Sequence, residues 1–377
     1  MFISSRRAIA LTAALGFVIG LSFLTVKYDG HIALESAVRS LTGQQEKKTT
    51  TGFPAAQVAY NWTQVQAEGR FAYVQYTTDL SYLCNAMINF SRLKEFGARH
   101  QMALIYPDTW DDEGKSSASA RRNRIINTIR SDYPHINLHP SPVLRLPNHD
   151  PTWGDSITKF HAFSLVNYTR MLAFDSDTLV LNNMDHYFQA PRASLAVPRA
   201  YWLGDLRNTT VSINEQILGS HVMLLEPNTR RYERIVKEAM ASGEFDMEVV
   251  NRLFKGSAMI LPHRGLALLT GEFRSKDHSR YLVGDGEDGE EWDAIGEVKR
   301  SFLVHFSDWP LPKPWMRHSD QQWRDALPSC EEGERKRRRR RTAGRRDEGD
   351  CPDRVVWRGF YEEYEREREA KCGFINE

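Results

Sequence analysis

The chain has few cysteines, almost no net charge and none of the common nucleotide-binding signatures. Its four cysteines in 377 residues are too few for a disulfide framework. The net charge of +1 excludes a surface that binds nucleic acid or anionic membranes over its whole extent. No GxGxxG follows the first predicted strand, and no GxxxxGKS/T or GxSxG occurs, so the usual markers of dinucleotide, P-loop and serine-hydrolase chemistry are absent.

The chain contains enough apolar material for a sizeable core, with 41% hydrophobic and 11% aromatic residues. Periodicity predicts strands that alternate with helices, which is typical of an α/β fold around a mostly parallel sheet. We expect strands over 71–76, 102–106, 136–138, 143–146, 171–174, 178–181, 194–197, 221–225, 257–261 and 302–305. We expect helices over 82–96, 121–130, 155–167, 228–241 and 246–254, and a surface loop over 271–296.

The N-terminus predicts membrane attachment. Residues 8–26 form a run of 19 without charge, and at about 1.5 Å rise per residue such a helix spans a bilayer core. Arg6 and Arg7 precede the run, so we expect a type II protein whose remainder lies in the secretory lumen; a cleavable signal peptide is the alternative. Four glycosylation sequons fit that compartment, at Asn61, Asn89, Asn167 and Asn208.

The C-terminal part combines a charge run with three cysteines. Residues 335–341 read RKRRRRR, which fits either a nucleic-acid patch or a solvated, disordered loop. The lumenal location favours the loop, so we expect no nucleic-acid partner. Cys84 lies in an apolar helical pattern and is predicted to be a free core thiol. Cys330 and Cys351 would enclose the arginine run, but with Cys372 nearby the sequence leaves the pairing open.

These features predict a linear domain order. It comprises a cytoplasmic tail (1–7), an anchor (8–26), a stem (27–60), a catalytic domain (61–327), a basic disordered insertion (328–354) and a C-terminal helix that packs on the catalytic domain (355–377).

An acidic triplet at the end of a buried strand is the most informative local feature. The apolar run 171–174 leads into Asp175-Ser176-Asp177, and a second apolar run follows over 178–181. Buried carboxylates are costly without a cationic partner, and a hard divalent ion is a usual one. A turn is the alternative, because Asp and Ser are common in turns. The apolar flanks favour a site for a metal ion and a nucleotide diphosphate.

Other polar residues stand at strand ends or on a helix where they could complete such a site. Thr77, Thr78, Asp79 and Tyr82 follow the first strand, where a nucleoside could dock on the tyrosine face; packing is the alternative for this tyrosine. Lys159 could reach a phosphate, or else be an exposed helical lysine. His305 ends a late strand, where it could be a third metal ligand or else a histidine of the core, and Lys313 follows in WPLPKPW. An imidazole as third ligand fits Mn²⁺ better than Mg²⁺.

The segment DSITKFHAFSLVNYTRMLAFDSDTLVLNNMDHYF over 155–188 resembles the signature of glycosyltransferase family 8, the glycogenin-like enzymes. YVQYTTDLSYLCNAMINFSRL and VHFSDWPLPKPW are similar to two other landmarks of that family. The anchor, the stem, DWPLPKPW and the C-terminal VVWRGFYEEYEREREAKCG resemble a fungal Golgi branch, the α-N-acetylglucosaminyltransferases that cap outer-chain mannose.

This resemblance implies a GT-A fold, a UDP-sugar donor, Mn²⁺ and a glycan acceptor. The implied roles are metal ligation by Asp175, Asp177 and His305, uridine binding by Thr77, Thr78, Asp79 and Tyr82, contact with the diphosphate or sugar by Lys159 and Lys313, a place near the reacting sugar for Asp246, and donor contacts from Ser176, Ser220 and His221. Gly219-Ser220-His221 stands where the family has Asn-Ser-Gly, and Met247 replaces its usual Gln.

The predicted function is retaining, metal-dependent transfer of N-acetylglucosamine from UDP-GlcNAc to a mannose-containing glycan in the Golgi. A glucosyl- or galactosyltransferase with the same machinery is one alternative. A glycan-binding or scaffold protein without activity, whose acidic triplet holds Ca²⁺ only structurally, is the alternative from another class. An intact uridine site would argue against that last interpretation.

Overall fold

The computed structural model describes residues 70–114, 116–146, 154–203, 217–282, 290–330 and 350–376. The predicted anchor (8–26), stem (27–60) and arginine run (335–341) lie outside these residues. Within the described part, no helix combines the length and the apolar character needed to cross a membrane.

The larger of two sheets is mostly parallel. Its seven strands follow the order β3 (Ile136–Ser141), β2 (Gln101–Pro107), β1 (Phe71–Tyr76), β4 (Arg170–Phe174), β7 (Val222–Leu225), β6 (Leu195–Pro198) and β8 (Met259–Leu261). All of them run in one direction except β7, which pairs antiparallel with β4 and β6. The predicted α/β class with a mostly parallel sheet is therefore confirmed.

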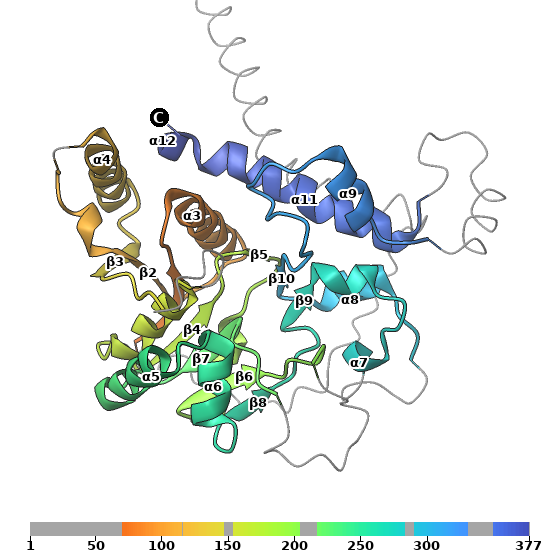
Figure 1. Cartoon of the computed structure of the whole chain (residues 1–377), viewed down its shortest axis with the longest axis horizontal. Coiled ribbons are helices and arrows are strands. Elements are labelled where there is room, and N and C mark those ends of the chain that lie inside the picture. Colours follow the sequence, from red (N-terminus) through yellow and green to blue (C-terminus); the bar gives the residue numbers. More distant parts are fainter. Residues whose placement is uncertain are drawn as a thin grey trace, which may run out of the picture.

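The smaller sheet lies next to the larger one, and the chain passes from β4 in the larger sheet directly into the smaller sheet (Figure 1). It contains β5 (Thr178–Val180), β10 (Leu303–His305) and β9 (Ala267–Leu269), with β10 in the middle. The chain leaves β4 in the large sheet and enters β5 in the small one through Asp175-Ser176-Asp177. The acidic triplet therefore lies at the junction of the two sheets.

Helices cover both faces of the large sheet, because successive residues of its central strands alternate between two apolar cores. Tyr73 belongs to the core under α3 (Leu80–Glu95), α4 (Ser117–Asp132) and the C-terminal α11 (Pro352–Lys371). Val74 belongs to the core under the 3₁₀ segment η2 (Ser156–Ser164), α5 (Thr229–Ser242) and α6 (Asp246–Phe254). Strands buried on both faces explain the continuous apolar runs in the sequence.

Two predicted elements differ from the structure for identifiable reasons. The segment 143–146 is not a strand, since the N–H and C=O of Leu144 both bond to the hydroxyl of Thr158 rather than to a neighbouring strand. The helix predicted over 155–167 is the shorter η2, whose residues 157–163 are all buried. Without a solvent face, this segment lacks the amphipathic pattern of a surface helix.

The loop predicted over 271–296 is partly ordered into helices. It contains most of η5 (Thr270–Arg274), the short helix α7 (Ser279–Leu282) and the start of α8 (Ala294–Arg300), while residues 283–289 lie outside the described part. Phe273 and Tyr281 insert into the core. The glycine and acidic residues that dominate the composition of this stretch concealed its aromatic anchors. The structure also adds β9, η1 (Asp108–Trp110), η3 (Asp185–Gln189), α9 (Asp320–Ala326) and α12 (Gly373–Asn376), which the periodicity did not predict.

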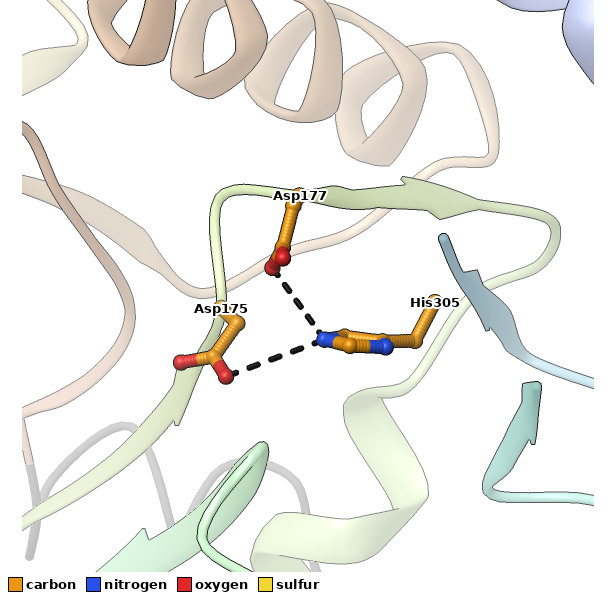
Figure 2. Close-up of side chains that lie close together, drawn as sticks. All are labelled: Asp175, Asp177 and His305. Carbon is orange, nitrogen blue, oxygen red and sulfur yellow. Dashed lines mark ion pairs between the residues drawn. The ribbon is translucent and has the colours of Figure 1, made fainter. Parts of the chain in front are cut away.

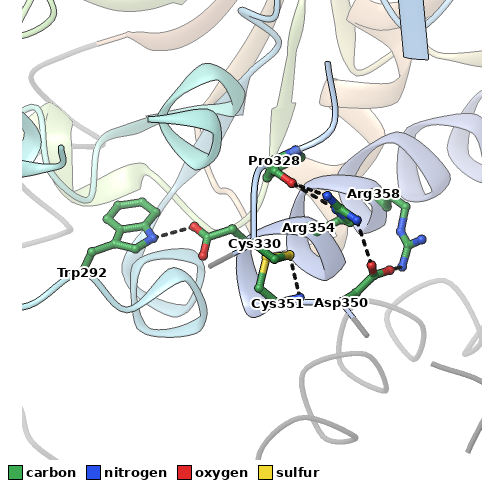
Figure 3. The surroundings of a disulfide bond; sticks show 8 residues. Trp292, Pro328, Cys330, Asp350, Cys351, Arg354 and Arg358 are labelled. Atoms are coloured by element: carbon green, nitrogen blue, oxygen red, sulfur yellow. Dashed lines mark hydrogen bonds and ion pairs between the residues drawn. A yellow bond between two sulfur atoms is a disulfide. The ribbon is translucent and has the colours of Figure 1, made fainter. Parts of the chain in front are cut away.

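All four cysteines are paired, so the prediction of a free thiol at Cys84 is wrong. Cys84 in α3 is bonded to Cys372, with 5.5 Å between their Cα atoms. Packing of α11 along α3 brings these residues together although 288 positions separate them in the sequence. Cys330 is bonded to Cys351, which settles the pairing that the sequence left open (Figure 3).

Two of the four sequons lie in the described part of the chain, and they differ in access. Asn167 is exposed. Asn89 is completely buried in α3, donates to the carbonyl of Thr178 and accepts from the N–H of Val180. Asn89 is therefore a structural residue that holds β5, and the folded protein offers it no room for a glycan.

Candidate active site

Asp175, Asp177 and His305 converge at the junction of the two sheets (Figure 2). His305 Nε2 lies 3.2 Å from Asp177 Oδ1 and 3.9 Å from Asp175 Oδ2. One possible ligand atom from each residue lies within 4.8 Å of those of the other two. Two carboxylates and an imidazole are thus within the span of one metal ion.

Strand pairing explains this convergence. In the antiparallel pair of β10 with β5, His305 stands opposite Thr178, which follows Asp177 directly. The N–H of Asp175 donates to the carbonyl of His221, the residue before β7. Backbone hydrogen bonds to β10 and to the start of β7 therefore hold the acidic triplet, and its geometry does not depend on flexible side chains.

Two lysines each occupy one oxygen of the paired aspartates. Lys159 Nζ lies 2.5 Å from Asp175 Oδ1, and Lys313 Nζ lies 2.7 Å from Asp177 Oδ2. The other oxygen of each aspartate faces His305 Nε2. Lys159 is only 4% exposed, so its alternative interpretation as a solvated helical lysine is wrong. Each lysine therefore neutralises the charge of one aspartate and leaves the second oxygen of that aspartate facing the histidine.

A third carboxylate shares Lys159. Asp246, the first residue of α6, accepts at Oδ2 from Lys159 Nζ at 2.7 Å and from the Ser220 hydroxyl at 2.6 Å. Burial alone would raise the pKa of Asp246, but Lys159 and Ser220 outweigh it and the pKa is lowered. Asp246 therefore stays ionised and fixed in place.

The two aspartates of the triplet differ in acidity. Burial, followed by repulsion from Asp177 and Asp246, raises the pKa of Asp175 to about 6 even though Lys159 opposes the shift. Burial also acts on Asp177, but His305 and Lys313 hold its pKa well below the usual range. Asp177 is thus ionised throughout the neutral range, whereas Asp175 takes up a proton in mild acid.

This difference predicts pH-dependent metal binding. A proton on Asp175 competes with a cation, so Mn²⁺ affinity of the donor-free protein should fall by about tenfold between pH 7 and pH 5. Calorimetric titration across that range measures the effect. Affinity that stays constant between these values would contradict the role of Asp175 as a ligand.

The residues fit a divalent cation. Three possible ligand atoms face one another: Asp175 Oδ2, Asp177 Oδ1 and His305 Nε2. The other ring nitrogen of His305, Nδ1, is buried without a hydrogen-bond partner among the described residues. One nitrogen with two carboxylates suits Mn²⁺, for which imidazole is a better ligand than for Mg²⁺. Such an ion would be held by Asp175, Asp177 and His305.

The site opens into a pocket of about 1190 Å³. Lys159, Asp175, Asp177, Ser220, His221, Asp246, His305 and Lys313 line one part of it, together with Thr78 and Tyr82 from the end of β1 and the start of α3. Most of the residues predicted from the sequence therefore meet in one cavity, although they come from distant segments.

Three predicted nucleotide contacts are engaged in local structure and do not line this pocket. Asp79 is the N-cap of α3 and accepts from the N–H groups of Ser81 and Tyr82. Thr77 is buried and donates to the carbonyl of Asp79. Ser176 is buried and donates to the carbonyl of Tyr76 at 2.5 Å. These residues shape the floor beside the pocket, and their direct contact with a nucleotide stays a prediction.

The segment Gly219-Ser220-His221, which differs from the family pattern Asn-Ser-Gly, is tightly packed. A Cβ added at Gly219 would lie 2.8 Å from His221 Cε1, so glycine is what makes room for the imidazole. His221 lies against Trp202 and His305, with ring centroids 5.6 and 5.9 Å away. Burial, then the neighbouring His305 and Lys159, lowers the pKa of His221 to about 3, which keeps this ring neutral.

Sequence reasoning missed a second group of residues that line the pocket. Its polar and aromatic lining includes Trp202, Glu272, Arg274, Asp277 and Arg280. Most of these residues belong to the stretch expected to be a surface loop. A useful signal would have been the aromatic residues spaced through that stretch, because they indicate segments anchored to a core.

Comparison with known proteins gives closely similar relatives. No model of a known protein family matches the chain. Glucose N-acetyltransferase 1 of Gibberella zeae is 38% identical over 305 residues, which cover 80% of this chain and 62% of that protein. Glucose N-acetyltransferase 1 of Aspergillus fumigatus is 33% identical over 335 residues, covering 84% and 80% respectively. The chain thus spans less than two thirds of the Gibberella protein and most of the Aspergillus one.

More distant similarity extends to glycogenin. Mouse glycogenin-1 is 27% identical over 193 residues, which cover 50% of this chain and 51% of that protein. Among solved structures, the galactosyltransferase LgtC with donor and acceptor sugar analogues is 15% identical and covers 70% of this chain and 99% of its own at a TM-score of 0.45. By its sequence, the chain belongs to the family of fungal proteins named glucose N-acetyltransferase 1, within the glycogenin-like glycosyltransferases of family 8.

Proposed function

We propose that the protein is a retaining, metal-dependent glycosyltransferase that moves N-acetylglucosamine from UDP-GlcNAc to a mannose-containing glycan. The observation that carries this proposal is the arrangement of Asp175, Asp177 and His305 with two lysines in one large pocket. Such an arrangement suits a leaving group with several negative oxygens, because cations placed there stabilise charge that develops in the transition state.

Two lysines and the three candidate metal ligands can together bind a diphosphate. Lys159 and Lys313 contact carboxylates in the donor-free protein, and both line the pocket. When a diphosphate arrives, each ammonium group can exchange part of its contact with aspartate for a phosphate oxygen. Mn²⁺, held by the two aspartates and His305, would neutralise further charge on the leaving diphosphate.

The choice of donor rests on the relatives and on the site together. The name of these relatives joins glucose with an N-acetyl group, the two components of N-acetylglucosamine. Read literally, that name would describe transfer of an acetyl group. The paired aspartates and two lysines favour a sugar nucleotide, since no negative charge develops on a diphosphate during acetyl transfer.

Pocket size and shape support a second substrate. The volume of about 1190 Å³ exceeds the roughly 300–1,000 Å³ that is common for a single small molecule. Trp202 offers an aromatic face, and Glu272 and Asp277 offer carboxylates, in the lining of the same pocket. Aromatic faces with nearby hydrogen-bond acceptors suit an uncharged sugar, and we propose a mannose-containing acceptor.

The environment of Asp246 favours retention through the same face of the sugar. This carboxylate holds Lys159 and Ser220 by hydrogen bonds, which lowers its ability to attack carbon. It can instead orient the lysine and the donor sugar. We propose that the leaving phosphate itself assists the acceptor hydroxyl, so that no covalent sugar intermediate forms on the protein.

A panel of UDP-sugars with Mn²⁺ tests the function directly. The purified domain should release UDP from UDP-GlcNAc, and a mannose-terminated oligosaccharide should increase the rate. Preference for UDP-glucose or UDP-galactose would replace the proposed donor. Absence of UDP release from every sugar nucleotide would favour a glycan-binding or scaffold protein.

We also propose that the protein resides in the Golgi membrane as a single-pass type II protein. The apolar run 8–26 and the preceding arginines motivate the topology, and two disulfides suit an oxidising compartment. Protease treatment of intact microsomes should leave the catalytic domain protected. Its digestion before detergent is added would overturn this topology.

A further inference from the structure

Helix α11 is covalently fastened at both ends. Its N-cap residue, Cys351, is bonded to Cys330, and its C-cap residue, Cys372, is bonded to Cys84 in α3. Around the first bond, Arg354 donates to the carbonyl of Pro328 and pairs with Asp350 (Figure 3). The helix therefore has a fixed position along the catalytic domain.

Between these two disulfides, α11 packs against the segment 306–315, which adjoins one residue of the candidate site and contains another. His305 precedes this segment and Lys313 lies within it. The Phe306 ring contacts Tyr361 and Tyr364 with centroids 5.3 and 5.5 Å apart. Trp315, at the far end of the segment, lies 5.9 Å from Tyr364. The aromatic face of α11 thus supports the segment 306–315 along its length.

One hydrogen bond joins this helix to the segment with defined direction. Tyr361 Oη donates to Asp308 Oδ2 at 2.8 Å, and both residues are buried. Arg274, which lines the pocket, lies 3.5 Å from Asp308 Oδ1 and donates to the carbonyl of Asp308 at 3.2 Å. Asp308 therefore connects a tyrosine of α11 with a cation in the pocket wall.

The geometry points to Tyr361 as a positioning residue for the donor site, acting through Asp308. The hydroxyl fixes the backbone between His305 and Lys313, so that both side chains meet Asp177. It also directs the carboxylate of Asp308 toward Arg274. This inference rests on the proposed function for its meaning in catalysis, but its effect on metal binding can be measured without a sugar donor.

The chain provides a matched control on the same helix. Tyr364 Oη also donates to a buried side-chain oxygen, but that oxygen belongs to Asn85 in α3 rather than to segment 306–315, which Tyr364 contacts only through its ring. Tyr361→Phe and Tyr364→Phe each keep the ring and remove one buried hydroxyl. A purely structural role predicts similar losses of thermal stability and no difference in binding.

The test compares these two variants with the wild type by calorimetric Mn²⁺ titration and by donor kinetics. We expect Tyr361→Phe to weaken Mn²⁺ binding and to raise the KM for UDP-GlcNAc by about tenfold, with a smaller change in kcat. Tyr364→Phe should leave the Mn²⁺ affinity and the KM within about twofold of the wild type. It should lower Tm by about as much as Tyr361→Phe does. Equal Mn²⁺ affinities in the two variants would overturn the inference.

A third variant tests the connection through Asp308. Asp308→Asn keeps an acceptor for Tyr361 but removes the charge that faces Arg274. Combined with Tyr361→Phe, it should give less than the sum of the separate effects on the KM, because both act on one group. Fully additive effects would contradict the proposed path. If Mn²⁺ binding shows the expected difference but no sugar nucleotide releases UDP, the proposed function fails and the positioning role stands.

Discussion

Replacing Asp175 or Asp177 by asparagine is expected to reduce transfer by about a thousandfold or more. The amide has nearly the same shape as the carboxylate but lacks the anionic charge that a divalent cation needs. Each substitution also removes one ion pair of a lysine, because Lys159 pairs with Asp175 and Lys313 with Asp177. Loss of UDP release with an unchanged circular dichroism spectrum is the expected result.

Asp111→Asn is a suitable control for this experiment. Asp111 also forms an ion pair, with Arg130, but it does not line the pocket. The control should retain wild-type turnover. Near wild-type turnover of either triplet variant at saturating Mn²⁺ would show that the metal assignment is wrong.

Deletion of residues 355–371 is expected to prevent stable folding. The deletion removes the buried side chains of Val356, Trp357, Phe360, Tyr361 and Tyr364. At about 1.5–3 kcal/mol for each buried apolar side chain, the lost contribution is comparable to the about 5–15 kcal/mol by which a typical protein is stable.

The same deletion leaves a buried charge without its partners. Arg92 in α3 lies 2.7 Å from Glu363 and 2.9 Å from Glu367, both on α11, and all three side chains are largely buried. Removing one side of a buried ion pair costs about 3–5 kcal/mol. We expect aggregated protein, or a melting transition without cooperativity in calorimetry.

Deletion of residues 336–346 is the control, since it removes 11 mostly charged residues from the arginine run instead of the apolar face of α11. Cys330 and Cys351 are joined on either side of it, with Cα atoms 5.4 Å apart, so a shorter connection still fits. Tm and UDP release should stay close to the wild type. Loss of activity in this variant alone would contradict the expectation and indicate an anionic substrate or partner of the arginine run.

Local sequence patterns predicted much of the frame around the site. The sequence shows two strands that end in polar residues. The apolar run of β4 leads into the acidic triplet, and β10 ends at His305. The helix predicted over 355–377 is also present, as α11 followed by the short α12. These predictions succeeded because the periodicity of a strand or a helix is a property of neighbouring residues.

The pairing of distant segments was not available from such patterns. Cys84 looks like a core thiol because its helix is apolar, and only the packing of α11 on α3 supplies Cys372 as its partner. By its sequence Lys159 could be either a phosphate contact or an exposed helical lysine, and only the fold shows that it is buried between Asp175 and Asp246. Each outcome depends on which elements touch.

The sequence by itself determined which residue types stand at the ends of the strands, and these residue types predicted a site for a cation and a diphosphate. The tertiary structure decided that β5 leaves the large sheet and pairs with β10, which sets His305 opposite Thr178 and beside Asp177. It also decided that Asp246 and Asp175 share one buried lysine. The physical reason is that backbone propensity acts over a few residues, whereas strand register and charge compensation are settled only when segments far apart in the chain are buried against one another.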